Sequence, residues 1–298
     1  MIPKSTPKRI STGICLKIAH SLIFTVMSML LMKYSKSLPI LQVLFCRVVA
    51  GSFIAFAILK LIKQPIPLKM SKQSVIFYGA RAFISFIAMS GWVITLKNIG
   101  VNEAVALGYV MPIWLIISAV LFFKEKLTIQ HVVIVSLNIL GVILILQPKF
   151  DTIDTMSLIA ALTSGLLWTV YNSICKKQTE TEHYLLQCFY TFVFSAVITL
   201  PLAIYLWEPI VTEQFFGLAL LGFVGVMNVS VLFLAYAYTP LIILVPFDYL
   251  RLLISMVLSY LLLSTPLTPG FLSGAAVIVS ADLYFYITQR ARKIRLNN

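Results

Sequence analysis

The stretch EAVALGYVMPIWLIISAVLFFKEKLTIQHVVIVSLNILGVILIL at residues 103–146 has a counterpart in LIILVPFDYLRLLISMVLSYLLLSTPLTPGFLSGAAVIVSADLYFYI at residues 241–287. Each is a pair of apolar runs joined by a short turn, and a proline interrupts the first run of each pair. Leu127-Thr128 aligns with Leu267-Thr268, which brings the two pairs into register. Because about 20 apolar residues are needed to cross a bilayer's hydrocarbon core, both stretches predict pairs of membrane-spanning helices.

Apolar runs of this length continue along the whole chain of 298 residues. Of these residues 60% are hydrophobic and 11% are charged, against about 45–50% and about 25% in soluble domains, which excludes a soluble enzyme. The runs do not alternate in segments of about ten residues, so a membrane β-barrel is disfavoured. The spans are expected at approximately 13–32, 40–62, 74–96, 102–123, 128–147, 155–175, 184–207, 214–238, 241–264 and 268–288. The predicted fold is an all-α polytopic membrane protein.

The ten spans divide into two repeats of five, residues 1–150 and 151–298, joined by an acidic linker around Asp151–Asp154. Because five is odd, the second repeat enters the membrane from the opposite side, which makes the two repeats inverted. Such repeats can exchange conformations and open a central site to either side of the membrane in turn. The alternative is that Leu-, Ile- and Val-rich helix pairs resemble one another by chance.

The net charge of +13 has two possible explanations: a surface that binds nucleic acid, or basic loops that set the orientation of the chain in the membrane. With the N-terminus inside, the tails and loops on that side carry fifteen Lys and Arg residues and the other side carries four. This positive-inside bias predicts that both termini are cytoplasmic and that nucleic acid is not a partner. We expect an integral protein of an inner (plasma) membrane.

Several short motifs, in order along nearly the whole chain, resemble the drug/metabolite transporter superfamily, in its ten-helix EamA-like branch. They are the Arg in Leu41–Arg47, Tyr78-Gly79-Ala80-Arg81, Ser90-Gly91-Trp92, Pro112 and the turn Lys124-Glu125-Lys126-Leu127-Thr128. The family repeats the acidic turn in the second half, where this chain has Ser264-Thr265-Pro266 instead.

The resemblance implies a secondary transporter with a central cavity, for cargo such as amino acids, nucleotide-like metabolites, sugars or amphipathic toxic compounds. Pro246-Phe247-Asp248-Tyr249-Leu250 is similar to a stretch of S-adenosylmethionine uptake carriers of intracellular bacteria. We therefore expect a small polar or zwitterionic cargo, moved by alternating access, and membrane lipids as the surrounding partner.

Ionisable residues near the bilayer centre are costly and mark candidate binding sites. Asp248 and Arg251 are three residues apart, so on one helix they share a face and can pair. Pro246 removes a backbone donor and can open that helix. The two charges therefore form either a binding station or a pair that only orders the bundle.

Arg81 could bind a substrate carboxylate or phosphate through its planar donors, or it could hold Asp248 or Asp282. For Arg47 we favour a structural role. Lys17 and Asp282 lie nearer the helix ends, where side chains reach water, so we expect both to be structural.

Aromatic and amide side chains are the remaining candidates for a cavity, because rings stack on purines and attract cations. They are Trp92, Tyr109, Trp114, Trp168 and Tyr249, with Asn172 as an amide partner. Each could equally be a packing residue. The small-residue pairs Ser255/Ser259 and Gly270/Gly274 are expected to pack helices.

The alternative class is a polytopic intramembrane enzyme that acts on lipid-linked substrates. The sequence has no H-E-x-x-H, G-x-S-x-G or P-loop motif, and its four cysteines show no metal-ligand spacing. We therefore expect no catalysis, cofactor or metal. Transport could be coupled to protons or to an exchanged metabolite, and the protein could be a monomer or a homodimer.

Overall fold

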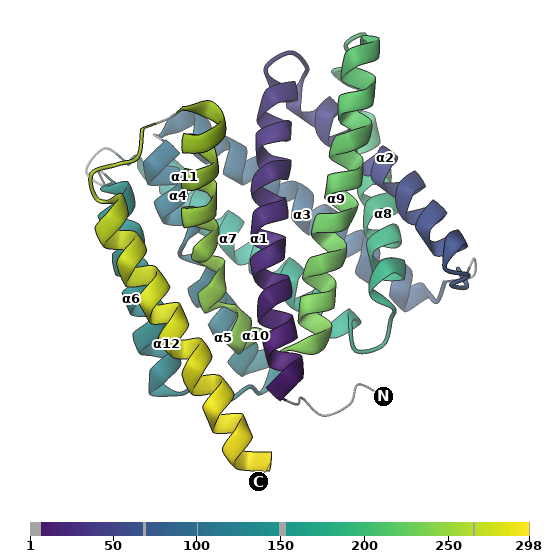
Figure 1. Cartoon of the computed structure of the whole chain (residues 1–298). Helices are drawn as coiled ribbons and strands as arrows, with labels where there is room; N and C mark the ends of the chain where they lie inside the picture. Colours follow the sequence, from purple (N-terminus) through teal and green to yellow (C-terminus); the bar gives the residue numbers. More distant parts are fainter. Residues whose placement is uncertain (1–6, 68–69, 100, 149–152, 265, 298) are drawn as a thin grey trace.

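The computed structural model describes residues 7–67, 70–99, 101–148, 153–264 and 266–297, which form helices and no strand (Figure 1). The helices are α1 (Pro7–Ser35), α2 (Ile40–Leu61), α3 (Lys72–Asn98), α4 (Val101–Gly108), α5 (Met111–Phe123), α6 (Ile129–Leu146), α7 (Thr155–Gln178), α8 (Tyr184–Tyr205), α9 (Thr212–Tyr238), α10 (Leu241–Leu244), the 3-10 helix η2 (Pro246–Asp248), α11 (Leu250–Leu263) and α12 (Phe271–Asn297).

Ten segments of the described chain are long and apolar enough to cross a membrane, which confirms the predicted number of spans. Eight of them are single helices. The fourth span consists of α4 and α5, separated at Tyr109 and Val110, and the ninth consists of α10, η2 and α11. Each broken span has a proline at or just after its break, Pro112 and Pro246, whereas α8 continues through Pro201 without a break.

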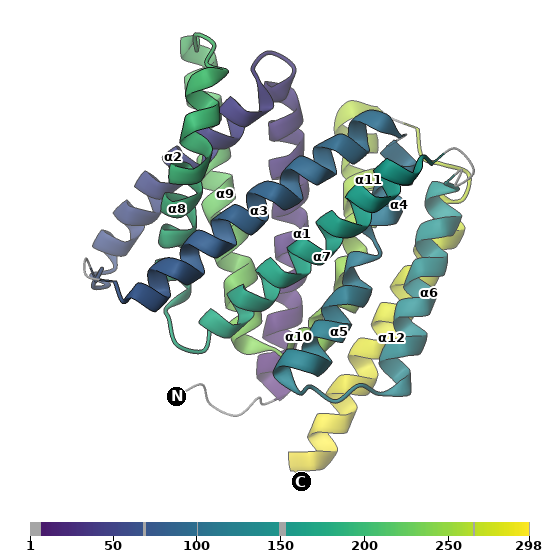
Figure 2. The ribbon, with the colours of Figure 1, turned by 180° about the vertical axis from the view of Figure 1, so that it is seen from behind.

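The helices pack mainly as partners that are far apart in the sequence. α1 lies beside α9 on one face of the bundle and α3 beside α7 on the other, as the two opposite views show (Figures 1 and 2). α2 packs on α8, and α6 packs on α12. Every one of these pairs joins a helix from the first half of the chain to one from the second half.

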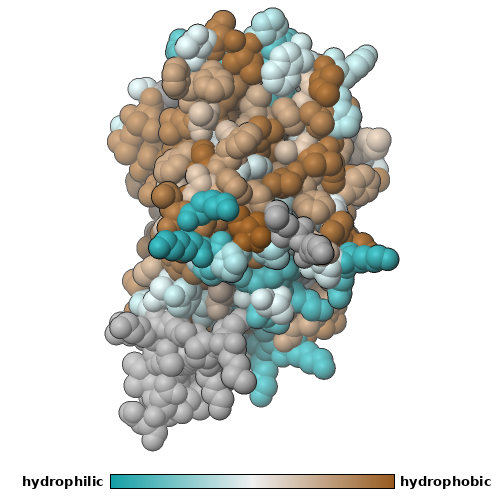
Figure 3. Space-filling view, turned by 90° about the vertical axis from the view of Figure 1, so that its right-hand side faces the viewer, coloured by the Kyte–Doolittle hydropathy of each residue, from teal (hydrophilic) through white to brown (hydrophobic). Residues whose placement is uncertain are grey.

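One end of the bundle carries most of the basic side chains. α1 begins and α12 ends there (Figure 1), and we call it the basic end. Its helix ends and loops carry Lys60, Lys63, Lys72, Lys124, Lys126, Lys176 and Lys177, whereas those of the opposite end carry Lys33, Lys36 and Lys97. Figure 3 shows the same asymmetry on one face, where hydrophilic side chains gather toward the lower end.

The outer surface between the two ends is apolar. Phe53, Phe122 and Leu272 are each more than 70% exposed, while many polar side chains are buried inside the bundle. Such a surface suits hydrocarbon, in which large apolar side chains need no covering. The chain is therefore an all-α membrane protein, and its buried polar groups are the place to look for function.

Glycines allow α6 and α12 to approach closely. A Cβ atom on Gly274 would lie 2.5 Å from the Gly141 carbonyl oxygen, and a Cβ on Gly141 would lie 2.5 Å from Ile278 Cγ1. Gly270 contacts the Leu144 carbonyl in the same way. This confirms that Gly270 and Gly274 pack helices, because small residues let two backbones come together.

We predict that Gly274→Ala destabilises the protein by about 1–3 kcal/mol, because its methyl group overlaps backbone that cannot move aside. The measurement is thermal unfolding of the purified protein in detergent. Gly79→Ala in α3 is the matched control, since nothing lies within 4 Å of its added Cβ. Equal melting temperatures for the two variants would contradict the close α6–α12 contact.

Candidate functional site

The ninth span is broken at Pro246. α10 ends at Leu244, and the next turns are narrow, with Asp248 N–H donating to the Val245 carbonyl (3.1 Å) and Tyr249 N–H to the Pro246 carbonyl (3.2 Å). α-Helical geometry resumes at Leu250. The prediction that Pro246 opens this helix is confirmed, and the break carries the two candidates Asp248 and Tyr249.

The break in the fourth span meets the break in the ninth. Tyr109 lies between α4 and α5, and its ring stacks on that of Tyr249, with centroids 5.4 Å apart and planes 21° apart. The Tyr249 hydroxyl donates to the Tyr109 carbonyl at 3.3 Å. Two candidates that are 140 positions apart in the sequence therefore form one contact between the broken spans.

Asp248 forms a buried ion pair with Lys17 of α1. The Lys17 Nζ to Asp248 Oδ1 distance is 2.8 Å, and both side chains are only 4% exposed. The pair expected with Arg251 is not formed. Instead the Arg251 guanidinium lies over the Phe24 ring, 4.7 Å from its centroid. The reason is that α1 packs against the break, so Lys17 reaches Asp248 directly while Arg251 lies nearer Phe24, seven residues further along α1.

Further polar groups surround this ion pair. Lys17 Nζ lies 5.8 Å from the centroid of the Tyr236 ring, and the Tyr236 hydroxyl donates to Asn172 Oδ1 at 2.9 Å. One turn after Lys17, His20 Nδ1 donates to the Asn228 carbonyl at 3.2 Å. α1, α7 and α9 therefore contribute a continuous set of polar side chains beside the break.

The three candidate tryptophans are half-buried on different helices. Trp92 of α3 packs against Gly108, directly before Tyr109. Trp168 of α7 meets Tyr171 edge-on, with centroids 5.4 Å apart. Trp114 of α5 has a buried indole N–H with no hydrogen-bond partner, which leaves one donor available beside the break.

Arg81 lies in a separate cluster and is fully buried. Its guanidinium donates to Gln178 Oε1 of α7 and to Thr191 Oγ1 of α8, the latter at 2.8 Å. Three aromatic rings lie within 5.4 Å of it, those of Tyr78, Tyr171 and Phe233. The structure therefore does not bring Arg81 to the break, and its contacts join four helices.

Sequence reasoning missed Lys17, which it treated as a side chain near the membrane surface. The two residues could have been matched by their depth in the membrane. Lys17 lies seven residues after Ile10 and Asp248 seven residues after Leu241, and both spans start at the same end of the bundle. It also missed the contact between Asn138 of α6 and Asp282 of α12, whose side chains hydrogen-bond at 2.8 Å.

Two charged side chains bind backbone groups around the start of the ninth span, at the basic end. The Glu125 carboxylate accepts hydrogen bonds from the Leu241 N–H (3.0 Å) and the Ile242 N–H (2.7 Å), the first donors of α10. Lys176 Nζ donates to the carbonyls of Tyr236 and Thr239, the latter at 2.9 Å. This end of the broken span is therefore held on both sides.

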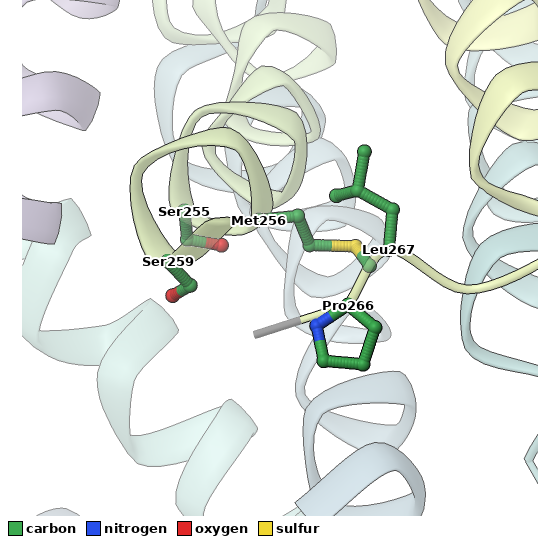
Figure 4. A pocket seen from close by; sticks show the side chains of 5 residues that line it. All are labelled: Ser255, Met256, Ser259, Pro266 and Leu267. Carbon is green, nitrogen blue, oxygen red and sulfur yellow. The ribbon is translucent and has the colours of Figure 1, made fainter. Parts of the chain in front are cut away.

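A small pocket lies toward the opposite end, between α11 and the segment that leads to α12 (Figure 4). Ser255 and Ser259 line it together with Met256, Pro266 and Leu267. The two serines therefore face a pocket in this conformation, and it contains none of the candidate side chains. Among the described residues, no three His, Cys, Asp or Glu side chains are close enough to hold a metal ion.

Relatives with known names are similar to this chain at modest sequence identity. An S-adenosylmethionine uptake transporter of Rickettsia bellii is 26% identical over 213 residues, which are 70% of this chain and 72% of that protein. A riboflavin transporter of Brucella anthropi is 25% identical over 68% of this chain and 74% of that protein. A pseudopaline exporter of Pseudomonas aeruginosa is 21% identical over 94% of this chain and 98% of that protein. All three names describe transporters and none describes an enzyme.

The fold also occurs among solved structures. One crystal structure matches 95% of this chain and 99% of its own, with a TM-score of 0.78 at 15% sequence identity. The family model described as "EamA-like transporter family" matches this chain twice, at residues 11–147 and 155–286. These two matches cover nearly the whole chain, and the protein belongs to the EamA-like transporter family.

Proposed function

We propose that this protein is a secondary carrier that moves a small zwitterionic metabolite across the membrane by alternating access. The observation that carries the proposal is the Lys17–Asp248 ion pair, buried where a membrane-spanning helix is broken. Charges inside a membrane are costly, and carriers use them where broken helices expose backbone groups to a substrate.

An inverted repeat of residues 1–150 and 151–298 supplies the alternating motion. The double match of the family model supports this division. Tyr109 lies eight residues after the start of α4 and Tyr249 eight residues after the start of α10, helices that begin at opposite ends of the bundle. Lys124 and Ser264, at equivalent positions, both end their helices in the left-handed conformation. These correspondences support two halves related by a two-fold axis in the membrane plane.

The substrate would be bound between the two breaks. Arg251 has no carboxylate within 4 Å among the described side chains, so it is available to a substrate carboxylate. Tyr109 and Tyr249 offer ring faces and Trp114 offers a free indole N–H. A metabolite with a carboxylate, a cationic centre and a flat ring fits this set, and the relatives named for S-adenosylmethionine uptake make that compound the first cargo to test.

The orientation follows from charge. With the basic end in the cytoplasm, both termini are cytoplasmic. The excess of lysines then lies in cytoplasmic loops, as the positive-inside rule predicts. A bacterial inner membrane is the expected location, consistent with the bacterial origin of the named relatives.

The experiment that tests the proposal uses purified protein in liposomes. Vesicles loaded with unlabelled S-adenosylmethionine should take up labelled S-adenosylmethionine by counterflow, saturably and above the rate of protein-free vesicles. Parallel vesicles loaded with amino acids or riboflavin test the other cargo classes. Absence of saturable counterflow for every cargo would overturn the assignment.

We predict that Arg251→Gln weakens binding of a carboxylate-bearing cargo roughly 10- to 150-fold, because a charge-assisted hydrogen bond contributes about 1.5–3 kcal/mol. The measurement is KM for counterflow, together with inhibition by the decarboxylated analogue. The analogue should bind wild type and variant equally, since it lacks the group that Arg251 contacts. Arg47→Gln is the matched control, because that arginine lies on α2 against Met27 and Phe192.

We also predict that Lys17→Met lowers the free energy of unfolding by about 3–5 kcal/mol, because it leaves the Asp248 carboxylate buried without its cation. The double variant Lys17→Met/Asp248→Leu should recover most of this stability and still lack counterflow. Thermal unfolding in detergent and counterflow measure the two effects. Lys33→Met is the control on the same helix, because Lys33 is exposed. A stable double variant with full counterflow would remove the ion pair from the mechanism.

A further inference from the structure

Asp282 is a second buried carboxyl group inside the bundle. It lies on α12 and is 2% exposed. Its Oδ1 accepts a hydrogen bond from Asn138 Nδ2 of α6 at 2.8 Å, whereas its buried Oδ2 has no hydrogen-bond partner. An ionised carboxylate normally has all its acceptor sites filled when it is buried.

The orientation of the Asn138 amide is fixed by its two contacts. Its Nδ2 also lies 3.3 Å from the Pro246 carbonyl, so the nitrogen, and not the oxygen, is the amide atom that bonds these two acceptors. That oxygen, Asn138 Oδ1, is buried and also without a donor. Two linked side chains therefore each have one acceptor that nothing satisfies.

None of the neighbouring cations compensates Asp282. α12 packs against α6, α1 and α11. The ionisable side chains that the structure describes on these helices are His131 on α6, Cys15, Lys17, His20, Lys33 and Tyr34 on α1, and Arg251 and Tyr260 on α11, while Asp248 and Tyr249 directly precede α11. The single ion pair within 4 Å in the described part of the chain is Lys17–Asp248, and Arg251 lies over Phe24. Asp248 carries the same charge as an ionised Asp282 and would repel it.

We propose that Asp282 is the proton-binding site of the carrier and that it holds a proton on Oδ2 in this conformation. The proton makes Oδ2 a donor, which is what Asn138 Oδ1 lacks, and the two side chains can then pair as a carboxylic acid with an amide. It also removes a charge that costs about 2.5–3.5 kcal/mol at the centre of a membrane. This inference rests on the proposed function, to which it adds the coupling ion.

The same asparagine connects the proton to the substrate site. Asn138 binds both Asp282 and the carbonyl of Pro246, the residue that opens the ninth span next to Asp248. A proton that enters from water on one side and leaves to water on the other converts Asp282 between an acid and a carboxylate. The carboxylate needs water or a cation, so its formation favours a conformation in which α6, α12 and the break have separated.

Transport measurements on an Asp282 variant distinguish a proton-binding role of this residue from a role in packing alone. Asp282→Asn preserves the shape of the side chain and supplies an amide donor in place of the protonated oxygen. We expect it to keep counterflow within about two-fold of wild type and to lose accumulation driven by a pH gradient. Asp154→Asn, at the exposed start of α7, should keep both activities. The proposal is overturned if Asp282→Asn accumulates cargo like wild type, or if wild type catalyses counterflow and ignores the gradient.

Infrared spectroscopy tests the proton without any cargo. At neutral pH the wild-type protein should show the C=O stretching band of a protonated carboxyl group, Asp282→Asn should lack it, and Asp248→Asn should retain it. A wild-type spectrum without this band would overturn the proposal. If no cargo is transported, the proposed function fails, and the band still decides whether Asp282 carries the proton.

Discussion

A broken helix inside a membrane leaves backbone groups without partners in a medium that contains no water, and this constraint organises the protein. At the breaks, the Pro246 carbonyl accepts from the Asn138 amide and the Tyr109 carbonyl accepts from the Tyr249 hydroxyl. At the basic end, where the ninth span begins, the Glu125 carboxylate accepts from the first N–H groups of α10. Each partner comes from another segment of the chain. The breaks are therefore stable only when both halves of the chain are assembled around them.

The contact between α6 and α12 has a role in this assembly. Gly141 and Gly274 bring the two backbones together, and on the same two helices Asn138 lies one turn before Gly141 and Asp282 about two turns after Gly274. A looser contact would move Asn138 away from the Pro246 carbonyl. On the other side of the break, α1 supplies Lys17, so the broken span is held between a packed helix pair and an ion pair. A movement of α6 and α12 would therefore be transmitted to the break and to the substrate site proposed there.

The spans were predictable because they depend on a local property, the length of an apolar run. Pro112 and Pro246 indicated the two breaks, although α8 continues through Pro201, so a proline alone does not decide where a helix breaks. The partners of the charged residues were not predictable. Spacing along one helix pointed from Asp248 to Arg251, but the ion pair forms with Lys17, because the arrangement of α1 against the break depends on the whole bundle. Arg81 shows the same limit, since its sequence context indicates the ring of Tyr78, three residues earlier on the same helix, but not those of Tyr171 and Phe233. The fold likewise decides that Trp92 packs against Gly108 and that Trp168 meets Tyr171 of the Arg81 cluster.

The balance of charge inside the bundle constrains the cargo. Lys17 and Asp248 cancel, and a protonated Asp282 contributes nothing, whereas Arg47, Arg81 and Arg251 have no carboxylate within 4 Å among the described residues. Arg81 is enclosed by aromatic rings and Arg47 lies away from the break, which leaves Arg251 as the positive charge of the proposed substrate site. A cargo that is only cationic would be repelled by it. A cargo with a carboxylate is attracted, even when it carries cationic centres elsewhere, because the tyrosine rings of the breaks can accept those centres at their faces.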